Sequence, residues 1–357
     1  MNTFGDKIKI TVFGQSHAQG IGVVIDGLSA GFEIDVERLN SFMQRRAPGN
    51  DSFSTARKEA DKVEFVSGVV DGKTVGAPVC AVIFNSDTKS KDYSELREKM
   101  RPSHSDYPAF IKFGGQNDVR GGGAFSGRLT APICIAGGIL MQMLEKKGVY
   151  IGAHILSVKN VLDSGFDPVL CTKDDILAPS KKDFPVINEQ AGDAMKNIIL
   201  SAKADLDSVG GVIECAVAGM PAGVGEPMFL GLENIISSCV FAVPAVKGIE
   251  FGAGFESTRL FGSQNNDEYY FDENNEVKTL TNNAGGICGG LSTSMPIVFR
   301  TAIKPTPSIA KSQNTVNVKT GKNDVLEIKG RHDPCIVQRA VPCIEAVTAI
   351  ALSQFLL

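Results

Sequence analysis

The segment 129–144 restricts the fold of this chain more than any other feature, because it contains no charged side chain. The apolar pattern extends to Lys147 and runs almost all the way round a helix, which indicates a helix buried between layers of a protein. The uncharged segment is shorter than the roughly 18 apolar residues that span a bilayer. We therefore expect a core helix in a protein that has no membrane partner.

Three further segments carry helical patterns. Val36–Arg46 follows Asp35, a candidate N-cap residue, and places its apolar side chains on one face. The segment 188–204 is amphipathic, and the segment 342–357 has Pro342 near its first turn. These patterns predict three helices in addition to the buried one.

Short segments rich in valine and isoleucine, bounded by Gly, Asp or Pro, recur along the chain and are typical of strands. They span residues 7–12, 21–25, 63–70, 78–84, 150–158, 209–218, 296–302 and 325–329. Strands interleaved with buried helices favour an α+β fold, in which sheet layers pack on helices. No shift in composition marks a second domain, so we expect residues 1–357 to form a single domain.

Composition and charge exclude several classes of protein. Hydrophobic residues make up 43% of the 357 positions and charged residues 21%, as in ordinary globular proteins. The net charge of −4 argues against nucleic acid as a main partner, because nucleic-acid-binding proteins usually carry a basic excess. The 38 glycines exceed the usual share of about 7%, which indicates tight turns and ligand loops lined by backbone.

The cysteines and the first residues indicate a reducing compartment. The eight cysteines include no CxxC pair and fall mostly within apolar stretches, so we interpret them as reduced core residues and expect no metal site. The first nine residues are polar and mixed in charge, unlike a signal peptide. A cytoplasmic location is therefore expected.

Three of the four histidines stand in polar, charge-rich segments, namely His17, His104 and His332. Two of these three have an arginine and an aspartate within three residues, an arrangement that can bind an anion and move a proton beside it. A single histidine is more often structural than catalytic, but the three together indicate an enzyme. His154 alternates with apolar residues and is expected to belong to a strand.

Two loops have the composition of anion-binding sites. Three glycines, Gly121 to Gly123, precede Ser126, Arg128 and the buried helix, and could present backbone N–H groups to a phosphate. The segment 304–308 combines a cation and two hydroxyls on a backbone that two prolines stiffen. A simple turn and a rigid surface loop are the structural alternatives. No GxGxxG or GxxxxGK[ST] pattern supports a dinucleotide fold or a P-loop.

These motifs, in this order, resemble the chorismate synthase family over essentially the full length of the chain. The GESHG box of the family corresponds to residues 14–18, its RPGHAD box to residues 101–106, and its GGGRSSARET box, in altered form, to residues 121–130. Further matching segments are 245–252, 262–264, 284–286, 304–306 and 330–335.

Three places depart from the family pattern. Gln15 replaces a glutamate in the first box, and Ser52 stands where the family has an arginine. Ala124 and Phe125 replace an arginine and a serine in a loop that contacts flavin. These departures concern the binding of flavin and nicotinamide rather than membership of the family.

The resemblance implies a lyase that converts 5-enolpyruvylshikimate 3-phosphate to chorismate by 1,4-elimination of phosphate, the last step of the shikimate pathway. The family requires reduced FMN, and two sources of electrons stay open: reduction of the flavin by this chain with NADPH, or an external reductant. The resemblance also implies a β–α–β sandwich, with long helices packed between antiparallel sheets, and a homotetramer.

The resemblance assigns roles residue by residue. His104 matches the acid that protonates the leaving phosphate, His17 matches the histidine that protonates the reduced flavin, and Asp333 matches the aspartate that assists proton removal through the flavin. The implied substrate-binding residues are Arg46, Arg101, Arg128 and Arg331. The implied flavin contacts are Ala124, Phe125, Ser126, Pro244, Ala245, Gly289, Lys304, Pro305, Thr306, Pro307, Ser308 and Arg331. The implied NADP contacts are Arg46 and Ser52.

Two alternatives come from other classes of function. A metal-dependent phosphohydrolase would use His17, His104, Asp106, His332 and Asp333, although their spacing matches no metal signature. A non-catalytic flavin-binding protein would need the flavin loops but not the two catalytic histidines and Asp333 together.

Overall fold

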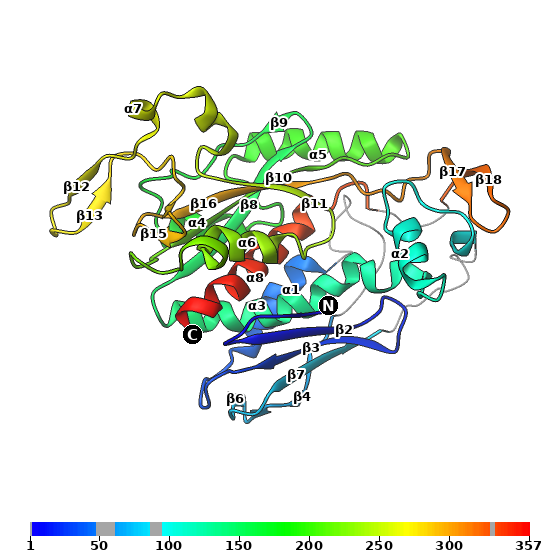
Figure 1. Cartoon of the computed structure of the whole chain (residues 1–357), viewed down its shortest axis with the longest axis horizontal. Helices are drawn as coiled ribbons and strands as arrows, with labels where there is room; N and C mark the ends of the chain where they lie inside the picture. Colours follow the sequence, from blue (N-terminus) through cyan, green and yellow to red (C-terminus); the bar gives the residue numbers. More distant parts are fainter. Residues whose placement is uncertain (1, 48–60, 86–94, 329–332) are drawn as a thin grey trace.

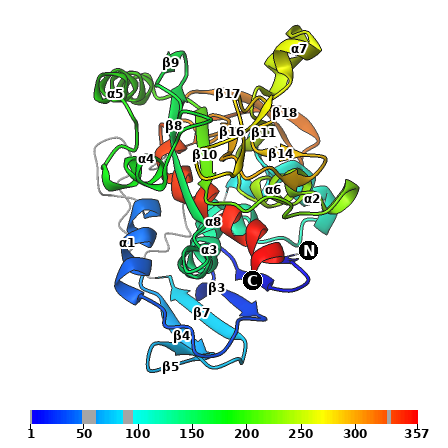
Figure 2. The same cartoon turned by 90° about the vertical axis from the view of Figure 1, so that its left-hand side faces the viewer.

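The computed structural model of the chain describes residues 2–47, 61–85, 95–328 and 333–357. Two five-stranded antiparallel sheets lie on opposite sides of a layer of long helices (Figures 1 and 2). The first sheet has the strand order β1-β2-β3-β7-β4. Its strands are β1 (Thr3–Phe4), β2 (Lys9–Gly14), β3 (Gly20–Asp26), β7 (Val79–Phe84) and β4 (Glu64–Ser67). A small hairpin, β5 (Val69–Val70) and β6 (Lys73–Thr74), follows β4 in the chain.

The second sheet has the strand order β11-β16-β10-β8-β9. Its strands are β11 (Val246–Phe251), β16 (Ile297–Ile303), β10 (Gly211–Ala218), β8 (Tyr150–Val158) and β9 (Val161–Leu162). The central strand β10 pairs with β16 on one side and with β8 on the other, and Cys215 lies opposite both Phe299 and Ala153. The two sheets therefore take their strands from separate parts of the sequence.

Three helices form the layer between the sheets: α1 (Val36–Arg46), α3 (Thr130–Glu145) and α8 (Val337–Leu356). α3 contacts α1, α8, β3, β7 and β8, and α8 contacts α1, β8 and β10. One hydrophobic cluster joins side chains of both sheets to these helices. The expected α+β sandwich, with helices between antiparallel sheets, is confirmed.

Shorter elements surround this sandwich. α4 (Lys173–Leu177) and α5 (Glu189–Ala204) pack against β8, and α6 (Leu232–Val240) packs against α8 and β11. The other helices are α2 (Asp106–Phe113), α7 (Gly262–Asn265) and the 3-10 turns Glu95–Arg97, Arg120–Phe125, Gly127–Leu129, Pro179–Lys181, Met228–Leu230 and Gly254–Arg259. The remaining hairpins are β12 (Tyr269–Phe271) with β13 (Val277–Thr279), β14 (Ile287–Cys288) with β15 (Leu291–Ser292), and β17 (Gln313–Asn317) with β18 (Lys322–Leu326).

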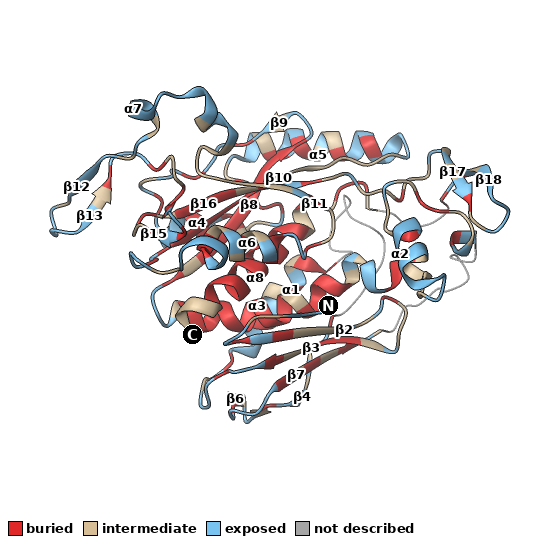
Figure 3. Cartoon of the chain, viewed as in Figure 1, coloured by how far each residue is buried: buried red, intermediate tan, exposed pale blue. Residues whose placement is uncertain are grey.

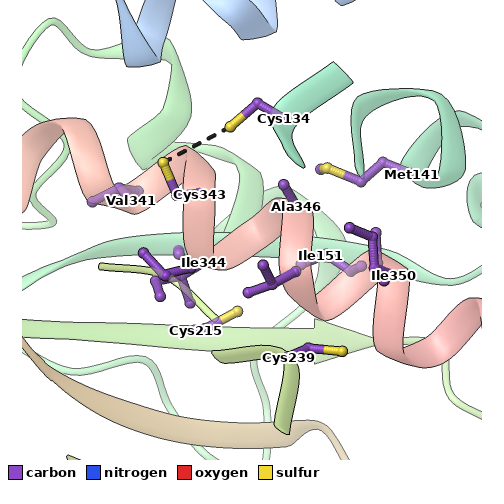
Figure 4. Packing of buried hydrophobic residues seen from close by; sticks show 14 of the residues in the cluster. Cys134, Met141, Ile151, Cys215, Cys239, Val341, Cys343, Ile344, Ala346 and Ile350 are labelled. Atoms are coloured by element: carbon purple, nitrogen blue, oxygen red, sulfur yellow. Dashed lines mark hydrogen bonds between the residues drawn. The ribbon is translucent and has the colours of Figure 1, made fainter. Parts of the chain in front are cut away.

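α3 is buried almost all round, as its uncharged sequence predicts (Figure 3). It meets α8 with both helices running in the same direction, because Cys134 faces Cys343 and Gly137 faces Ala346 one turn further along each helix. The two sulfur atoms are 3.8 Å apart among apolar side chains (Figure 4). Six of the eight cysteines are buried, in line with the core role expected of them, whereas Cys288 is exposed.

In the part of the chain that the structure describes, two helices are long and apolar enough to cross a membrane by length and composition alone, Gly127–Glu145 and Val337–Leu356. Within the protein, however, 89% and 78% of their apolar windows are buried. Their hydrophobicity therefore matches their position in the core of the sandwich.

The predicted cap is confirmed, since Asp35 accepts from Arg38 N at 2.9 Å. Asn188, which was not predicted as a cap, also caps its helix by accepting from Gln190 N at 2.8 Å. The predicted start of the last helix is wrong. α8 begins at Val337 and contains Pro342 in its interior, where the ring removes one helical N–H donor. The helix begins before this proline because Val337, Ala340 and Val341 are buried in the core.

Most predicted strands lie within two residues of those in the structure, and two differ more. The segment 325–329 was expected to be a strand, but β18 spans Lys322–Leu326, because the turn at Gly321 (φ +68°) fixes its register against β17. The segment 63–70 is interrupted at Gly68 (φ +81°) and forms β4 and β5. Local turn geometry thus overrides the apolar pattern at both places.

The close contact between α3 and α8 predicts that Gly137→Ala destabilises the protein. A Cβ atom at Gly137 would lie 2.3 Å from the Cα atom of Ala346, so backbone must move. Overpacking of this kind typically costs about 1–3 kcal/mol, which exceeds the gain of about 1 kcal/mol from the higher helix propensity of alanine. Urea unfolding should show a lower midpoint for this variant.

Gly262→Ala is the matched control, because a Cβ atom there meets no atom within 4 Å and the backbone has no positive φ. Its unfolding midpoint should stay within error of the unmodified protein. An unchanged or higher midpoint for Gly137→Ala would show that the two helices can separate without penalty.

Candidate active site

The three glycines before α3 bring two of the predicted catalytic histidines together. Gly121, Gly122 and Gly123 all have positive φ (+59°, +86° and +56°), which glycine adopts readily. A Cβ atom at Gly121 would lie 2.8 Å from His17 Nε2, and one at Gly122 would lie 3.5 Å from His104 Nε2. Both imidazoles therefore lie against consecutive residues of one backbone segment.

The loop that carries His17 is fixed to this segment by backbone and by charge. Ser16 N donates to Gly123 O at 3.2 Å. Asp118 accepts from the Arg120 guanidinium at 2.8 and 2.7 Å, and this interaction, with a smaller contribution from His17, holds the pKa of Asp118 below its usual value. An ionised carboxylate thus lies close enough to His17 to influence its charge.

His104 belongs to a buried cluster with an arginine and an aspartate. Arg101 donates from Nε to Asp106 Oδ2 at 2.7 Å and from Nη2 to Oδ1 at 2.8 Å. His104 Nδ1 lies 2.6 Å from the same Oδ1. The carboxylate therefore orients the imidazole through Nδ1, and Nε2 is the ring nitrogen that lies against Gly122.

Asp106 remains ionised in this cluster. Burial by itself would raise the pKa of its carboxyl group, but the hydrogen bonds from Arg101 and His104 outweigh burial and hold the pKa well below the usual value. A carboxylate of this kind can stabilise a positive charge on His104 when the imidazole holds a proton. The arrangement suits an acid that acts beside an anion.

A second cluster joins two of the predicted substrate-binding arginines through one carboxylate. Arg46, the last residue of α1, forms an ion pair with Asp61 at 3.1 Å, and Arg128 pairs with the other oxygen of Asp61. All three side chains are buried, with exposed fractions of 1%, 0% and 8% for Arg46, Asp61 and Arg128. Asp61 thereby sets the spacing between the two guanidinium groups.

Asn85 connects this second cluster to the His17 loop. Its side-chain oxygen accepts from Arg128 Nε at 3.3 Å, and its amide nitrogen donates to Ala18 O at 2.9 Å. Arg128 N also donates to Ser126 Oγ at 3.2 Å, which orients the arginine from its own loop.

Asp333 is linked to the second cluster through Arg339. Its Oδ2 accepts from Arg339 Nη1 at 2.5 Å, and Arg339 Nε donates to Arg46 O at 3.0 Å. One side chain of α8 thus contacts the predicted base and the end of the helix that carries Arg46.

The loop 304–308 meets the His104 cluster and the segment that precedes β11. Lys304 donates from Nζ to Ser103 O, and Lys304 N donates to Ala245 O at 3.0 Å. Burial, together with the nearby charge of Lys247, lowers the pKa of Lys304. Arg101 Nη1 donates to Ser308 Oγ at 3.3 Å. The predicted flavin contacts Ala245, Lys304 and Ser308 are therefore neighbours in space.

Two further hydrogen bonds close these contacts into a ring, the site ring. Ser208 Oγ donates to Thr306 O at 2.7 Å, and Val209 N donates to Pro334 O at 2.8 Å, beside Asp333. The site ring runs, in order, through His104, Gly122, Gly121, His17, Ala18, Asn85, Arg128, Asp61, Arg46, Arg339, Asp333, Pro334, Val209, Ser208, Thr306, Ser308 and Arg101. His17, His104 and Asp333, distant in sequence, thus belong to one connected structure.

Not every predicted residue joins the site ring. Gly289 turns between β14 and β15 at the start of α6, where Leu232 N donates to Gly290 O, whereas Pro244 and Ala245 follow the other end of α6. The nine residues of α6 span about 13 Å. Ser52, Arg331 and His332 lie outside the described residues.

Phe125 and Ala124 occupy the loop between the glycines and Ser126. Phe125 is partly exposed, at 41%, and its ring lies 6.4 Å from that of Phe113 on α2. Ala124, between Gly123 and Phe125, has a small, exposed side chain. These two departures from the family pattern therefore add an aromatic surface beside Gly123.

Asp61, Asn85 and Arg339 have central places in the site ring but were not predicted from the sequence. No motif surrounds Asp61 or Asn85, and their roles depend on contacts with residues far away in the chain. Arg339 gave one usable signal, because it follows Asp333 by six residues at the start of an apolar segment. His154 is fully buried in β8, as its apolar neighbours predict.

Comparisons with known proteins point to a single family. A sequence profile of chorismate synthase matches residues 8–357. A chorismate synthase of Lancefieldella parvula is 44% identical and covers 98% of this chain and 95% of its own length, and one of Dehalococcoides mccartyi is 43% identical with coverages of 100% and 96%. A crystal structure of a chorismate synthase superposes with a TM-score of 0.75 at 25% identity, covering 99% of this chain and 92% of that one.

The Asp106 cluster predicts a pH-dependent loss of stability in Asp106→Asn. A carboxylate with a depressed pKa stabilises the fold above its unfolded pKa of about 3.9 and loses this effect as the pH falls toward the folded value. Removing one partner of a buried ion pair typically costs about 3–5 kcal/mol. Urea midpoints should therefore differ most at pH 7, and the gap should narrow below about pH 4.

Asp207→Asn is the control, since Asp207 pairs with the exposed Lys311 at 2.9 Å. Exposed pairs contribute about 0–1 kcal/mol, so this variant should unfold almost like the unmodified protein. A difference between Asp106→Asn and the unmodified protein that stays constant as the pH falls from about 4 to about 2 would contradict the electrostatic role of Asp106.

Proposed function

This chain belongs to the chorismate synthase family, and from that premise we propose that it converts 5-enolpyruvylshikimate 3-phosphate to chorismate with reduced FMN as cofactor. As a member of this family it is an enzyme, a lyase of the shikimate pathway. The substrate, the cofactor and the roles of individual residues are the proposed part.

The observation that carries the proposal is the site ring, which joins a candidate acid, a candidate base and three of the predicted substrate-binding arginines. Elimination of phosphate breaks a carbon–oxygen bond, removes a proton from the ring carbon at the other end of the alkene system and leaves a second ring double bond. The departing phosphate therefore needs cations and a proton, and the substrate needs a base. His104 with Arg101 suits the first need, and Asp333 suits the second.

Arg46, Arg101 and Arg128 would bind the anionic groups of the substrate, its phosphate and two carboxylates. A guanidinium group has five N–H donors in a planar fork, so Asp61 or Asp106 can orient it while other donors remain for a ligand. The first turns of α3 and α8 lie at the same end of the sandwich, and helix N-termini also favour anions. We propose this end of the helix layer as the substrate site.

The residues present fit a bound flavin. Among the described residues, the hydroxyl of Thr306 is buried and makes no hydrogen bond. Its loop carries five predicted flavin contacts, of which Thr306 and Ser308 contact other members of the site ring. Lys304, Thr306 and Ser308 would bind its polar groups, together with the Ala245 backbone, and the exposed ring of Phe125 would pack on it. When bound, reduced FMN supplies electron density that stabilises the electron-deficient carbon as phosphate departs.

The protein itself would manage the protons. His104 would donate from Nε2 to a phosphate oxygen, and Asp106 would stabilise the charged imidazole before the transfer. His17 would supply a proton near the flavin, and the Asp333 carboxylate would accept the proton that the substrate loses. NADPH, if it is the reductant, would contact Arg46, whereas Ser52 lies outside the described residues.

We also propose that the chain assembles as a homotetramer in the cytoplasm. The resemblance to the family implies this assembly, and exposed apolar side chains on the projecting arm 253–283 support it (Figure 1). They include Phe255, Phe261, Tyr269, Phe271 and Leu280. Apolar patches of this kind commonly mark protein interfaces.

The test of the proposed function is phosphate release from 5-enolpyruvylshikimate 3-phosphate under anaerobic conditions. We expect turnover with reduced FMN, no turnover with oxidised FMN in air, and no effect of EDTA. Activity that requires a metal and not flavin would favour a phosphohydrolase. Flavin binding without any turnover would favour a non-catalytic flavoprotein.

His104→Ala should lower turnover about 10²–10⁴-fold, the usual contribution of a positioned acid, because the leaving phosphate would lose its proton donor. Flavin affinity, measured by titration, should stay close to that of the unmodified protein. His154→Ala is a poor comparison because it disrupts the core, so Lys311→Ala, on the exposed surface, is the control for handling and assay. Near-normal turnover of His104→Ala between pH 6 and pH 8 would remove His104 from the mechanism.

A further inference from the structure

Arg339, in the first turn of α8, contacts two functional parts of the site ring at once. Its Nη1 donates to Asp333 Oδ2 at 2.5 Å and its Nε donates to Arg46 O at 3.0 Å. Both side chains of the ion pair are largely buried, with exposed fractions of 20% for Arg339 and 14% for Asp333. The two bonds leave the guanidinium in different directions and therefore define its orientation.

The contact with Arg46 O also gives a hydrogen-bond donor to a carbonyl group in the last turn of α1. The last carbonyl groups of a helix have no partner within the helix, and a cation there complements the helix dipole. A second residue of α8, Glu345, accepts from Nη1 and Nη2 of Arg45 at 2.6 and 2.8 Å, and it also accepts from Ala153 N at 3.1 Å. α8 thus holds the last turn of α1 at two points, and Arg339 is the one next to the site.

We propose that Arg339 is a positioning residue, which fixes the Asp333 carboxylate relative to Arg46 and so sets the proposed base at a defined distance from the bound substrate. This inference rests on the proposed function in assigning the roles of Asp333 and Arg46. Its geometric part, the placement of both groups by one guanidinium, does not depend on that function.

The side chain must be arginine for this task. A lysine ammonium is a single point charge on a flexible stem, so it can pair with Asp333 or with Arg46 O but does not hold the two in a fixed relation. A glutamine has neither the charge nor the fork. We therefore expect Arg339→Lys to lose little stability but much of its turnover. Arg339→Gln should lose much of both.

The alternative is that Arg339 only stabilises the fold. A structural ion pair would lower the unfolding midpoint when it is broken, but the effects of Arg339 and Asp333 on turnover would then be independent. Positioning predicts that they are coupled, because Arg339 can affect the chemical step only through a working carboxylate at Asp333.

The experiment is a double-mutant cycle of Arg339→Gln and Asp333→Asn, measured by anaerobic single-turnover kinetics on flavin-saturated enzyme. Misplacement of a catalytic group by about 1 Å can cost about 10²-fold, so Arg339→Gln should slow the reaction about 10–100-fold and raise KM through the displaced Arg46. In the Asp333→Asn background the same change should slow it less than about 3-fold. Equal effects in both backgrounds would overturn the inference.

Arg38→Gln is the matched control, because Arg38 is also an arginine of the helix layer that pairs with a carboxylate, Glu145 of α3, but at the far end of α1. It should change the unfolding midpoint without changing kcat or KM. Guanidinium ion added to Arg339→Ala should restore part of the rate, and it should have no effect on the unmodified enzyme.

Crystal structures of the unmodified protein and of Arg339→Gln give a readout that does not depend on activity. We expect the Asp333 carboxylate and the last turn of α1 to shift relative to each other by about 1 Å. If both stay in place, the inference is wrong whatever the kinetics. If the unmodified enzyme releases no phosphate, the proposed function fails, and the crystal structures still decide the role of Arg339.

Discussion

The parallel packing of α3 against α8 between two sheets is the constraint on which the rest of the structure depends. Gly137 allows the backbones to approach so closely that a Cβ atom would lie 2.3 Å from Ala346, and the pair is covered by strands on both sides (Figure 2). Because the helices run in the same direction, their first turns lie at one end of the sandwich. α1 runs the other way, since Asp35 N, beside its first turn, donates to Gln142 near the end of α3. Its last turn, with Arg46, therefore lies at that same end.

Charge balance then decides the form of this end of the molecule. An unpaired charge in a buried site is costly, and each buried arginine of the site ring has a carboxylate partner. Asp61 serves Arg46 and Arg128, Asp106 serves Arg101, and Asp333 serves Arg339. These pairs hold the guanidinium groups in place before a ligand arrives, so that binding an anionic substrate needs little reorganisation of the protein.

The contrast between His104 and His154 shows how surroundings separate a functional histidine from a structural one. His154 lies between Glu214 and Asp163 beneath α5, fully buried, with Nε2 3.1 Å from Glu214. Burial lowers the pKa of His154, but the two carboxylates raise it more, so the net shift is upward. Its two ring nitrogens are both occupied by core partners. His104, in contrast, uses Nδ1 for Asp106 and turns Nε2 toward the glycine loop.

The sequence by itself determined the layered α+β fold, the buried helix and the identity of the groups that can do chemistry, because an uncharged segment has only the core in which to lie and because histidine, arginine and aspartate carry their chemistry wherever they stand. It also placed most strands within a few residues, and the N-cap Asp35. Only the tertiary structure decided which of these groups meet. Asp61 and Asn85 have no local signal, and the position of Arg339 in the sequence does not show its partners, since each of the three acts by joining residues from different elements. The start of α8 follows from the burial of its first residues, which outweighs the preference of proline for the first turn of a helix. The register of β18 follows from the turn before it, which outweighs the preference of the apolar residues after it for a strand. A pattern along the chain records what each residue prefers, whereas the site ring depends on distances between residues that only the packed helices bring together.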